Sequence, residues 1–221
     1  ATFTAIIEGF VGMGDLPTAL SWFNKLLQQK TDASENPLSA LDRGLPSRPH
    51  KAAVLVMINA LLQAKNIPEL DRILSLVKPS MWADHREPVL LAHLEDAARL
   101  NGEQALERLD WVKEHYLGAT VWDSLLHRAV YGVVEGYIRV GALSSAVDVV
   151  EGLQSSLSSQ LGHEGVHENI RNLALLVSEG ASAALASNAE GLVWSFDSAL
   201  KLATLTVEKF ALGVSPVQSY W

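Results

Sequence analysis

His163, Glu164 and His167 form a His-Glu-x-x-His pattern, the arrangement in this chain most suggestive of metal chemistry. On a helix, two histidines four positions apart lie on one face and can share a zinc ion, with the glutamate as general base. Gly162 and Gly165 interrupt the rigid helix that this chemistry needs. A polar helix start accounts for the same residues, so we interpret the match as incidental and expect no metal and no cofactor.

Aromatic side chains are a second source of binding chemistry, because nucleic-acid bases stack on them. The chain has six tryptophans, at positions 22, 82, 111, 122, 194 and 221. Most fall on apolar helical faces, and we therefore interpret them as core residues. Trp82 lies in a corner beside Pro79, where the pattern does not choose between the two roles.

Basic side chains that could contact phosphate occur in two places. Arg43, Arg48, His50 and Lys51 cluster in and after a long connection, where they could clamp a phosphate backbone, but we favour the interpretation as a solvated loop. Arg128 and Arg139 lie eleven residues apart, about three helical turns, so both can point to one side of a helix. The chain has no glycine-rich phosphate loop and no nucleophile elbow, and we expect no enzymatic activity.

The acidic charge balance of the chain is poor evidence for nucleic-acid binding. The chain of 221 residues has a formal net charge of −8. Residues 1–100 hold 10 Lys+Arg and 11 Asp+Glu, whereas residues 101–221 hold 7 and 14. Nucleic-acid binding normally depends on Lys and Arg, so an RNA ligand has to be reconciled with this acidic second half.

Composition indicates a folded chain, because 48% of the residues are hydrophobic and 19% are charged. The absence of cysteine excludes disulfides and Cys-based zinc sites in this sequence. No apolar run approaches the roughly 20 residues that span a bilayer, so we expect no membrane span. Because the sequence starts inside a helix-forming motif without Met, we expect a fragment or a processed form that lacks its targeting segment.

Helical periodicity runs through the whole chain, and no convincing alternating strand pattern appears. Pro, Gly and Asn punctuate the helices and separate them into pairs. We expect a polar loop over 30–50 that carries one short helical turn. The expected helices cover residues 3–13, 17–29, 50–64, 68–77, 87–100, 103–116, 120–140, 143–157, 164–186 and 189–212.

One helix pair recurs. Residues 2–23 give a helix, a Gly14-Asp15 corner and a second helix, and residues 134–147 repeat this pattern around Gly141. Both copies contain an acid-Gly-aromatic triplet, a Leu two residues after the corner and an Ala three residues after that Leu. Weaker copies occur at 55–77 and 95–112. A recurring helix pair predicts a stacked array that serves as a binding surface.

The two clear copies resemble the pentatricopeptide repeat. The resemblance covers about the first 155 residues, and we divide the chain into repeats over 1–155 and a long C-terminal helical hairpin over 156–221. The resemblance implies an all-α fold, a right-handed solenoid of about five helix-turn-helix hairpins. It also implies binding of single-stranded RNA, usually a mitochondrial or plastid transcript.

The same resemblance implies roles for individual residues. The base-reading position falls on Thr4 in the first copy and on Tyr131 in the later one. The phosphate-facing position falls on Gly12 and on Arg139. In the copy at 55–77 these positions fall on Leu55, which cannot hydrogen-bond a base, and on Gln63.

We therefore expect an organellar, mitochondrial RNA-binding protein that supports transcript maturation, stability or translation, with Thr4, Arg128, Tyr131 and Arg139 at the RNA. As further partners we expect proteins of a ribonucleoprotein. The alternative is a helical-repeat scaffold for protein interactions, for example a subunit of a mitochondrial ribosome. The acidic second half and the apolar helices at 164–212 favour that alternative.

Overall fold

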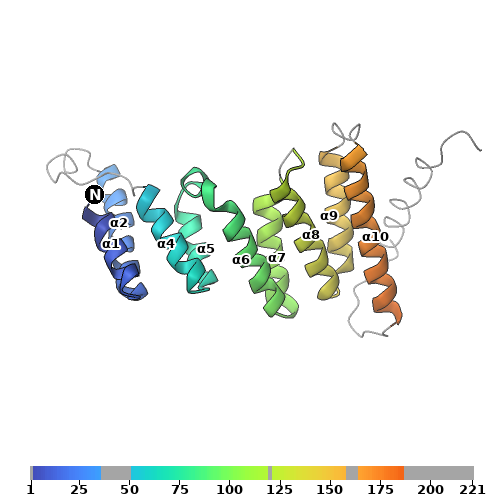
Figure 1. Cartoon of the computed structure of the whole chain (residues 1–221), viewed down its shortest axis with the longest axis horizontal. Helices are drawn as coiled ribbons and strands as arrows, with labels where there is room; N and C mark the ends of the chain where they lie inside the picture. The colour runs from blue at the N-terminus through green and yellow to red at the C-terminus, as the bar shows by residue number, and fades with distance from the viewer. Residues whose placement is uncertain (1, 36–50, 119–120, 158–163, 187–221) are drawn as a thin grey trace, which may run out of the picture. The chain divides into compact units, whose positions relative to one another are not determined.

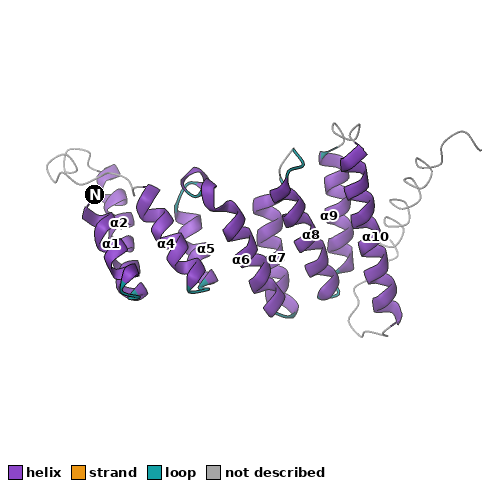
Figure 2. Cartoon of the chain, in the orientation of Figure 1, coloured by secondary structure: helices purple, strands orange, loops and turns teal. Residues whose placement is uncertain are grey.

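The computed structural model describes residues 2–35, 51–118, 121–157 and 164–186, which form α-helices and short 3-10 turns (Figure 1, Figure 2). No β-strand occurs in these ranges, so the all-α expectation is confirmed for them. The helices are α1 (Thr2–Gly12), α2 (Leu16–Glu35), α4 (Lys51–Gln63), α5 (Ile67–Leu76), α6 (Arg86–Arg99), α7 (Gly102–Tyr116), α8 (Ser124–Arg139), α9 (Leu143–Ser156) and α10 (Glu164–Ala186), with 3-10 turns η1 (Pro79–Met81) and η2 (Ala83–His85).

Two boundaries differ from the expectation. α2 continues to Glu35 instead of ending at residue 29, because no helix-breaking residue occurs before Pro37. α8 begins at Ser124 instead of residue 120, because the Asp123 side chain caps the helix by accepting a hydrogen bond from the Leu126 N–H at 2.7 Å. The rest of the expected loop, with its helical turn, and the expected helix at 189–212 lie outside the described residues.

The chain divides into two compact units, residues 1–92 and 93–221, with the division inside α6. In the first unit α1 packs against both α2 and α4, and α4 also packs against α5. In the second unit α8 packs against α7, α9 and α10. In both units, therefore, helices that are consecutive in the sequence form antiparallel pairs.

Three corners between paired helices share one hydrogen-bond pattern. Each has a residue of positive φ, namely Gly14 (76°), Lys65 (52°) and Gly141 (79°). Its N–H donates to the carbonyl three residues earlier, and the next N–H donates to the carbonyl five residues earlier. These bonds satisfy the last carbonyls of α1, α4 and α8 and turn the chain into the next helix. The corners therefore align the three hairpins residue by residue.

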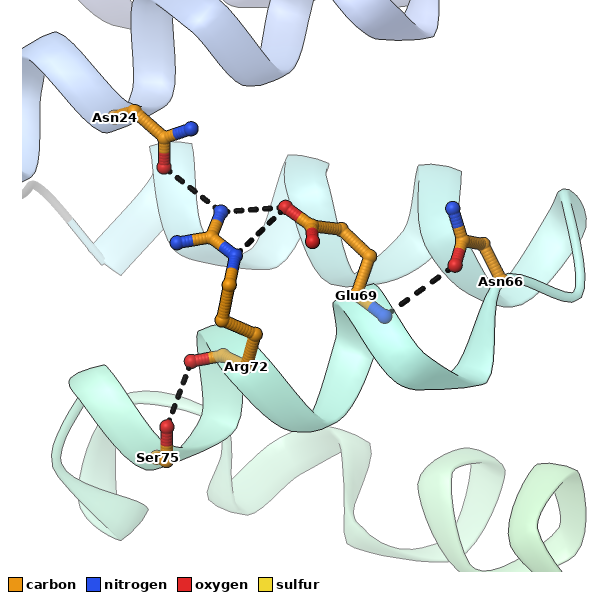
Figure 3. Close-up of polar contacts among 5 residues, drawn as sticks. All are labelled: Asn24, Asn66, Glu69, Arg72 and Ser75. Carbon is orange, nitrogen blue, oxygen red and sulfur yellow. Dashed lines mark hydrogen bonds and ion pairs between the residues drawn. The ribbon is translucent and has the colours of Figure 1, made fainter.

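In the first unit, a polar contact ties α5 to α2 (Figure 3). Arg72 on α5 donates to the Asn24 side-chain oxygen on α2 at 2.8 Å and to the Glu69 carboxylate at 2.5 Å. The Asn66 side chain caps α5 by accepting from the Glu69 N–H at 3.3 Å. The hydrogen bond from Arg72 to Glu69 raises the pKa of the guanidinium. Two different hairpins are thus joined through one guanidinium.

The second unit is closely packed around α8. Tyr137 is fully buried, and so are Val130, Val133 and Val134 on the same helix. Gly136 lies against Leu109 of α7, and Gly180 of α10 lies against Ile138 of α8. None of the helices described here is long and apolar enough to cross a bilayer.

Candidate nucleic-acid interface

α8 carries three of the four residues that the sequence assigned to RNA. Arg128 is exposed, Tyr131 is half-buried one turn later, and Arg139 ends the helix. Thr4 is half-buried on α1 and belongs to the other unit. The structure therefore brings Arg128 and Tyr131 onto adjacent turns of one helix.

A row of aromatic rings accompanies Arg128 and Tyr131. The rings of Trp122 and His127 meet edge to face, with centroids 5.8 Å apart. His127 and Tyr131 follow at 4.4 Å with a tilt of 34°. All three residues are half-buried, so part of the row faces solvent. Partly exposed rings can stack on nucleic-acid bases, and a neighbouring arginine can contact a phosphate.

The Tyr131 hydroxyl is oriented by α10. Burial raises the pKa of Tyr131, and the nearby carboxylates of Glu135 and Glu168 raise it further, whereas a hydrogen bond with Asn172 lowers it. A tyrosine phenol is protonated at neutral pH and can both donate and accept hydrogen bonds. A phenol positioned by a neighbouring amide has the chemistry to hydrogen-bond a base edge.

Arg139 has structural partners. Its guanidinium donates to the carbonyls of Ala97 at 2.5 Å and Leu100 at 3.3 Å, in the last turn of α6 and just after it. These carbonyls have no partner within their own helix, and a cation there also interacts favourably with the negative end of the helix. Arg139 therefore links α8 to α6.

The expected base-reading positions lie at the same distance from the three aligned corners. Thr4, Leu55 and Tyr131 each lie ten residues before the residue of positive φ, and each is half-buried. Gly12, Gln63 and Arg139 each lie two residues before it, and each is exposed. The residues that the sequence alignment matches thus share a burial class, although their side-chain types differ.

The tryptophans in the described ranges mostly contribute to packing. Trp82 is 5% exposed, which settles its role as a core residue. Trp111 is stacked between the rings of His93 and His115, with centroids at 3.8 and 4.0 Å, so neither of its faces is free for a base. Trp22 is half-buried against Phe3. Trp194 and Trp221 lie outside the described residues.

The basic cluster around residues 43–51 and the His-Glu-x-x-His pattern add no residue to this surface. Lys51 pairs with Asp84 at 2.6 Å, and this hydrogen bond lowers the pKa of Asp84. Arg43, Arg48, His50 and His163 lie outside the described residues, as do the side chains of Glu164 and His167. No group of three metal-binding side chains occurs in the part of the chain that the structure describes.

Sequence reasoning missed His127 and Asn172. The spacing His127–Tyr131 is four residues on one helix, so this pair was accessible from the sequence. Asn172 lies forty-one residues after Tyr131, and only the packing of α10 on α8 brings the two together.

Comparison with known proteins leaves the chain without an assigned family: no protein-family model matches it, and no curated protein matches its sequence.

Proposed function

We propose that this chain is an RNA-binding protein of the pentatricopeptide-repeat type, in which helical hairpins stack into a right-handed solenoid and bind single-stranded RNA. Three hairpins with the same corner geometry support a repeat architecture. We further propose that it acts in mitochondria on an organellar transcript, which rests on the resemblance of residues 2–23 and 134–147 to that family.

The observation that carries the proposal is the surface formed by Trp122, His127, Arg128 and Tyr131 on and before α8. Stacking on half-exposed rings needs no particular base, because every base has a π-face. The Tyr131 hydroxyl adds a hydrogen-bonding group for a base edge, and Arg128 adds positive charge for a phosphate. Thr4 would take the position of Tyr131 in the first hairpin.

A protein-interaction scaffold is the second candidate, and it is favoured by two observations. Arg139, the one basic residue at the three phosphate-facing positions, is bound to backbone carbonyls. Leu175 is 36% exposed on α10, where an apolar partner surface could cover it.

Fluorescence anisotropy tests the choice directly. The 221-residue chain is titrated into labelled 20-nucleotide RNA of randomised sequence at low salt, with a duplex of the same length as control. We expect binding of the single strand in clear preference to the duplex. Equal affinity for both forms, or no binding of either, would reject the RNA proposal. In the second case the protein-interaction scaffold would remain as the candidate function.

A further inference from the structure

A hollow of about 390 Å³ lies along one side of α2, in the first unit. Its lining residues occupy successive turns of that helix: Pro17, Leu20, Ser21, Asn24, Lys25 and Gln28. Pro17 and Leu20 are apolar, whereas the other four side chains carry hydrogen-bond donors. Among the described residues no carboxylate lines the hollow, although the chain as a whole is acidic. A hollow of this volume is large enough for a small molecule.

The neighbouring helix α5 fixes the orientation of the Asn24 amide (Figure 3). The Arg72 guanidinium has only donors, and it donates to Asn24 Oδ1 at 2.8 Å. Arg72 is itself held by two hydrogen bonds to the Glu69 carboxylate, at 2.9 and 2.5 Å. The Asn24 nitrogen therefore lies on the side away from Arg72, and its N–H groups have no partner within the described ranges. The amide thus keeps two donors for a ligand in the hollow.

Ser21 and Lys25 add further donors beside Asn24. Ser21 lies three residues before Asn24, so the two side chains are neighbours on one face of α2. The exposed Ser21 hydroxyl has no hydrogen-bond partner in the part of the chain that the structure describes. Lys25 is also exposed, and its ammonium lies 4.5 Å from the centre of the Trp22 ring. Because a ring occupies one side of an ammonium, Lys25 can still donate to an acceptor on another side.

We propose that this hollow binds a small phosphomonoester, that is, a terminal phosphate joined to an apolar or ring-shaped body. The phosphate would accept hydrogen bonds from Ser21, Asn24 and Lys25, and the Lys25 ammonium would balance part of its negative charge. The body of the ligand would lie against Pro17 and Leu20, where covering apolar surface is favourable. Arg72 acts as a positioning residue, because it holds the Asn24 amide with its donors turned away from α5.

The number of donors favours a phosphomonoester over other common anions. A phosphomonoester presents three terminal oxygens and carries close to two negative charges at neutral pH. A carboxylate has two oxygens and one charge, and so does the internal phosphodiester of an RNA backbone. Only the phosphomonoester can offer a separate oxygen to each of the three side chains.

Phenyl phosphate is a suitable probe, and its binding to the full chain is measured by isothermal titration calorimetry at neutral pH. Asn24→Asp is the most informative variant, because the new carboxylate still accepts from Arg72 but replaces the two N–H donors with a negative charge. We expect it to weaken the binding of phenyl phosphate by about tenfold or more. Thermal unfolding checks that this variant keeps its fold.

Gln63→Glu is the matched control, because it makes the same change from amide to carboxylate at an exposed position of α4. Its affinity for phenyl phosphate should stay within about twofold of the parent chain, since distant exposed charges are screened by salt. Lys25→Gln covers the case in which Asn24→Asp fails to fold. It removes the positive charge from an exposed position, and we again expect a loss of about tenfold.

Two competitors test the class of ligand. Benzoate keeps the ring but presents a carboxylate, and we expect it to bind about tenfold more weakly than phenyl phosphate. A 20-nucleotide RNA with a 5′-hydroxyl end contains only phosphodiesters, and it should not displace phenyl phosphate. Benzoate that binds as tightly as phenyl phosphate would overturn the assignment to a phosphomonoester. Displacement by the RNA would assign the hollow to nucleic acid instead.

Three further results would overturn the proposal. The first is no binding of phenyl phosphate to the parent chain. The second is parental affinity in Lys25→Gln or in a folded Asn24→Asp variant. The third is an equal loss in Asn24→Asp and Gln63→Glu, which would indicate a general effect of charge. All of the residues involved lie on α2 and α5, so failure of RNA binding at α8 leaves this inference intact.

Discussion

The Tyr137 hydroxyl donates a hydrogen bond to the Asp110 carboxylate and so ties α8 to α7. Tyr137 is fully buried, whereas Asp110 lies at the surface. Burial, the hydrogen bond and the negative charge of Asp110 together raise the pKa of Tyr137. The contact joins two consecutive hairpins at the triplet Glu135-Gly136-Tyr137, which recurs at the start of the chain as Glu8-Gly9-Phe10.

This contact predicts a loss of stability at alkaline pH. The unfolded chain ionises tyrosine near pH 10, while folded Tyr137 keeps its proton, so its contribution is complete below pH 10 and is lost above it. Above about pH 10, each tyrosine that stays protonated only in the folded chain lowers the free energy of unfolding by about 1.4 kcal/mol for every pH unit. Tyr137→Phe should cost about 1 kcal/mol at pH 7 and make the alkaline decline shallower.

Urea unfolding at pH 7 and at several pH values above 10 measures both effects. The pKa of Tyr131 is raised as well, so the wild-type decline contains two contributions and Tyr137→Phe removes one of them. An unchanged alkaline slope in Tyr137→Phe would show that Tyr137 is not protected from ionisation in the folded chain.

Arg139 gives a second prediction, because it binds the carbonyls at the end of α6. Arg139→Lys keeps the charge but removes the planar fork that reaches both Ala97 and Leu100. We expect it to lower the free energy of unfolding by about 1 kcal/mol. The matched control is Arg99→Lys, an exposed arginine that pairs with Glu95 at 3.7 Å on the helix surface, which should change stability by less than about 0.5 kcal/mol. Equal urea midpoints for the two variants would argue against the structural role of Arg139.

Lys65 gives a third prediction, because it holds φ at 52° where the other two aligned corners have glycine. A left-handed backbone conformation costs a residue with a side chain about 1–2 kcal/mol. Glycine avoids this cost, but it loses more conformational entropy on folding, which offsets part of the gain. Lys65→Gly should therefore stabilise the chain by about 0.5 kcal/mol. Gln63→Gly, two residues earlier in right-handed helix, should destabilise it by about as much. Thermal or urea unfolding that ranks these two variants in the opposite order would contradict the corner geometry.

Periodicity and corner residues predicted most of the fold. The helices expected at 50–64, 68–77, 87–100 and 103–116 all begin and end within about two residues of the observed bounds, because Pro, Asn and Gly at their ends act locally. The expected end of α2 at residue 29 is wrong, because a polar composition does not by itself end a helix and no helix-breaking residue precedes Pro37.

Less of the candidate site than of the fold could be predicted from the sequence. Spacing on one helix placed Arg128 and Arg139 on one side, since helical geometry is fixed, whereas Tyr131 was identified only through the resemblance to the repeat. It could not show that Arg139 reaches the carbonyls of α6 or that Asn172 reaches Tyr131, because those contacts depend on how separate helices pack. The burial of Trp82 likewise follows from tertiary packing and not from its place in a corner.

The central claim is that the α8 surface binds single-stranded RNA, and the salt dependence of binding by Arg128 variants tests it most directly. Affinity for the labelled 20-nucleotide RNA is measured by anisotropy between 50 and about 200 mM salt. For Arg128→Ala we expect weaker binding and a slope of log K against log salt that is smaller by about 1, the signature of one lost phosphate contact. Lys78→Ala, which removes an exposed positive charge in the other unit, should leave the slope unchanged.

Tyr131→Ala completes the same experiment, because it removes the stacking ring without changing the charge. We predict an affinity loss of about tenfold or more with the salt slope retained, since stacking on one ring contributes about 1–3 kcal/mol. Wild-type affinity and slope in both Tyr131→Ala and Arg128→Ala, in a chain that does bind RNA, would contradict the account and move the interface away from α8.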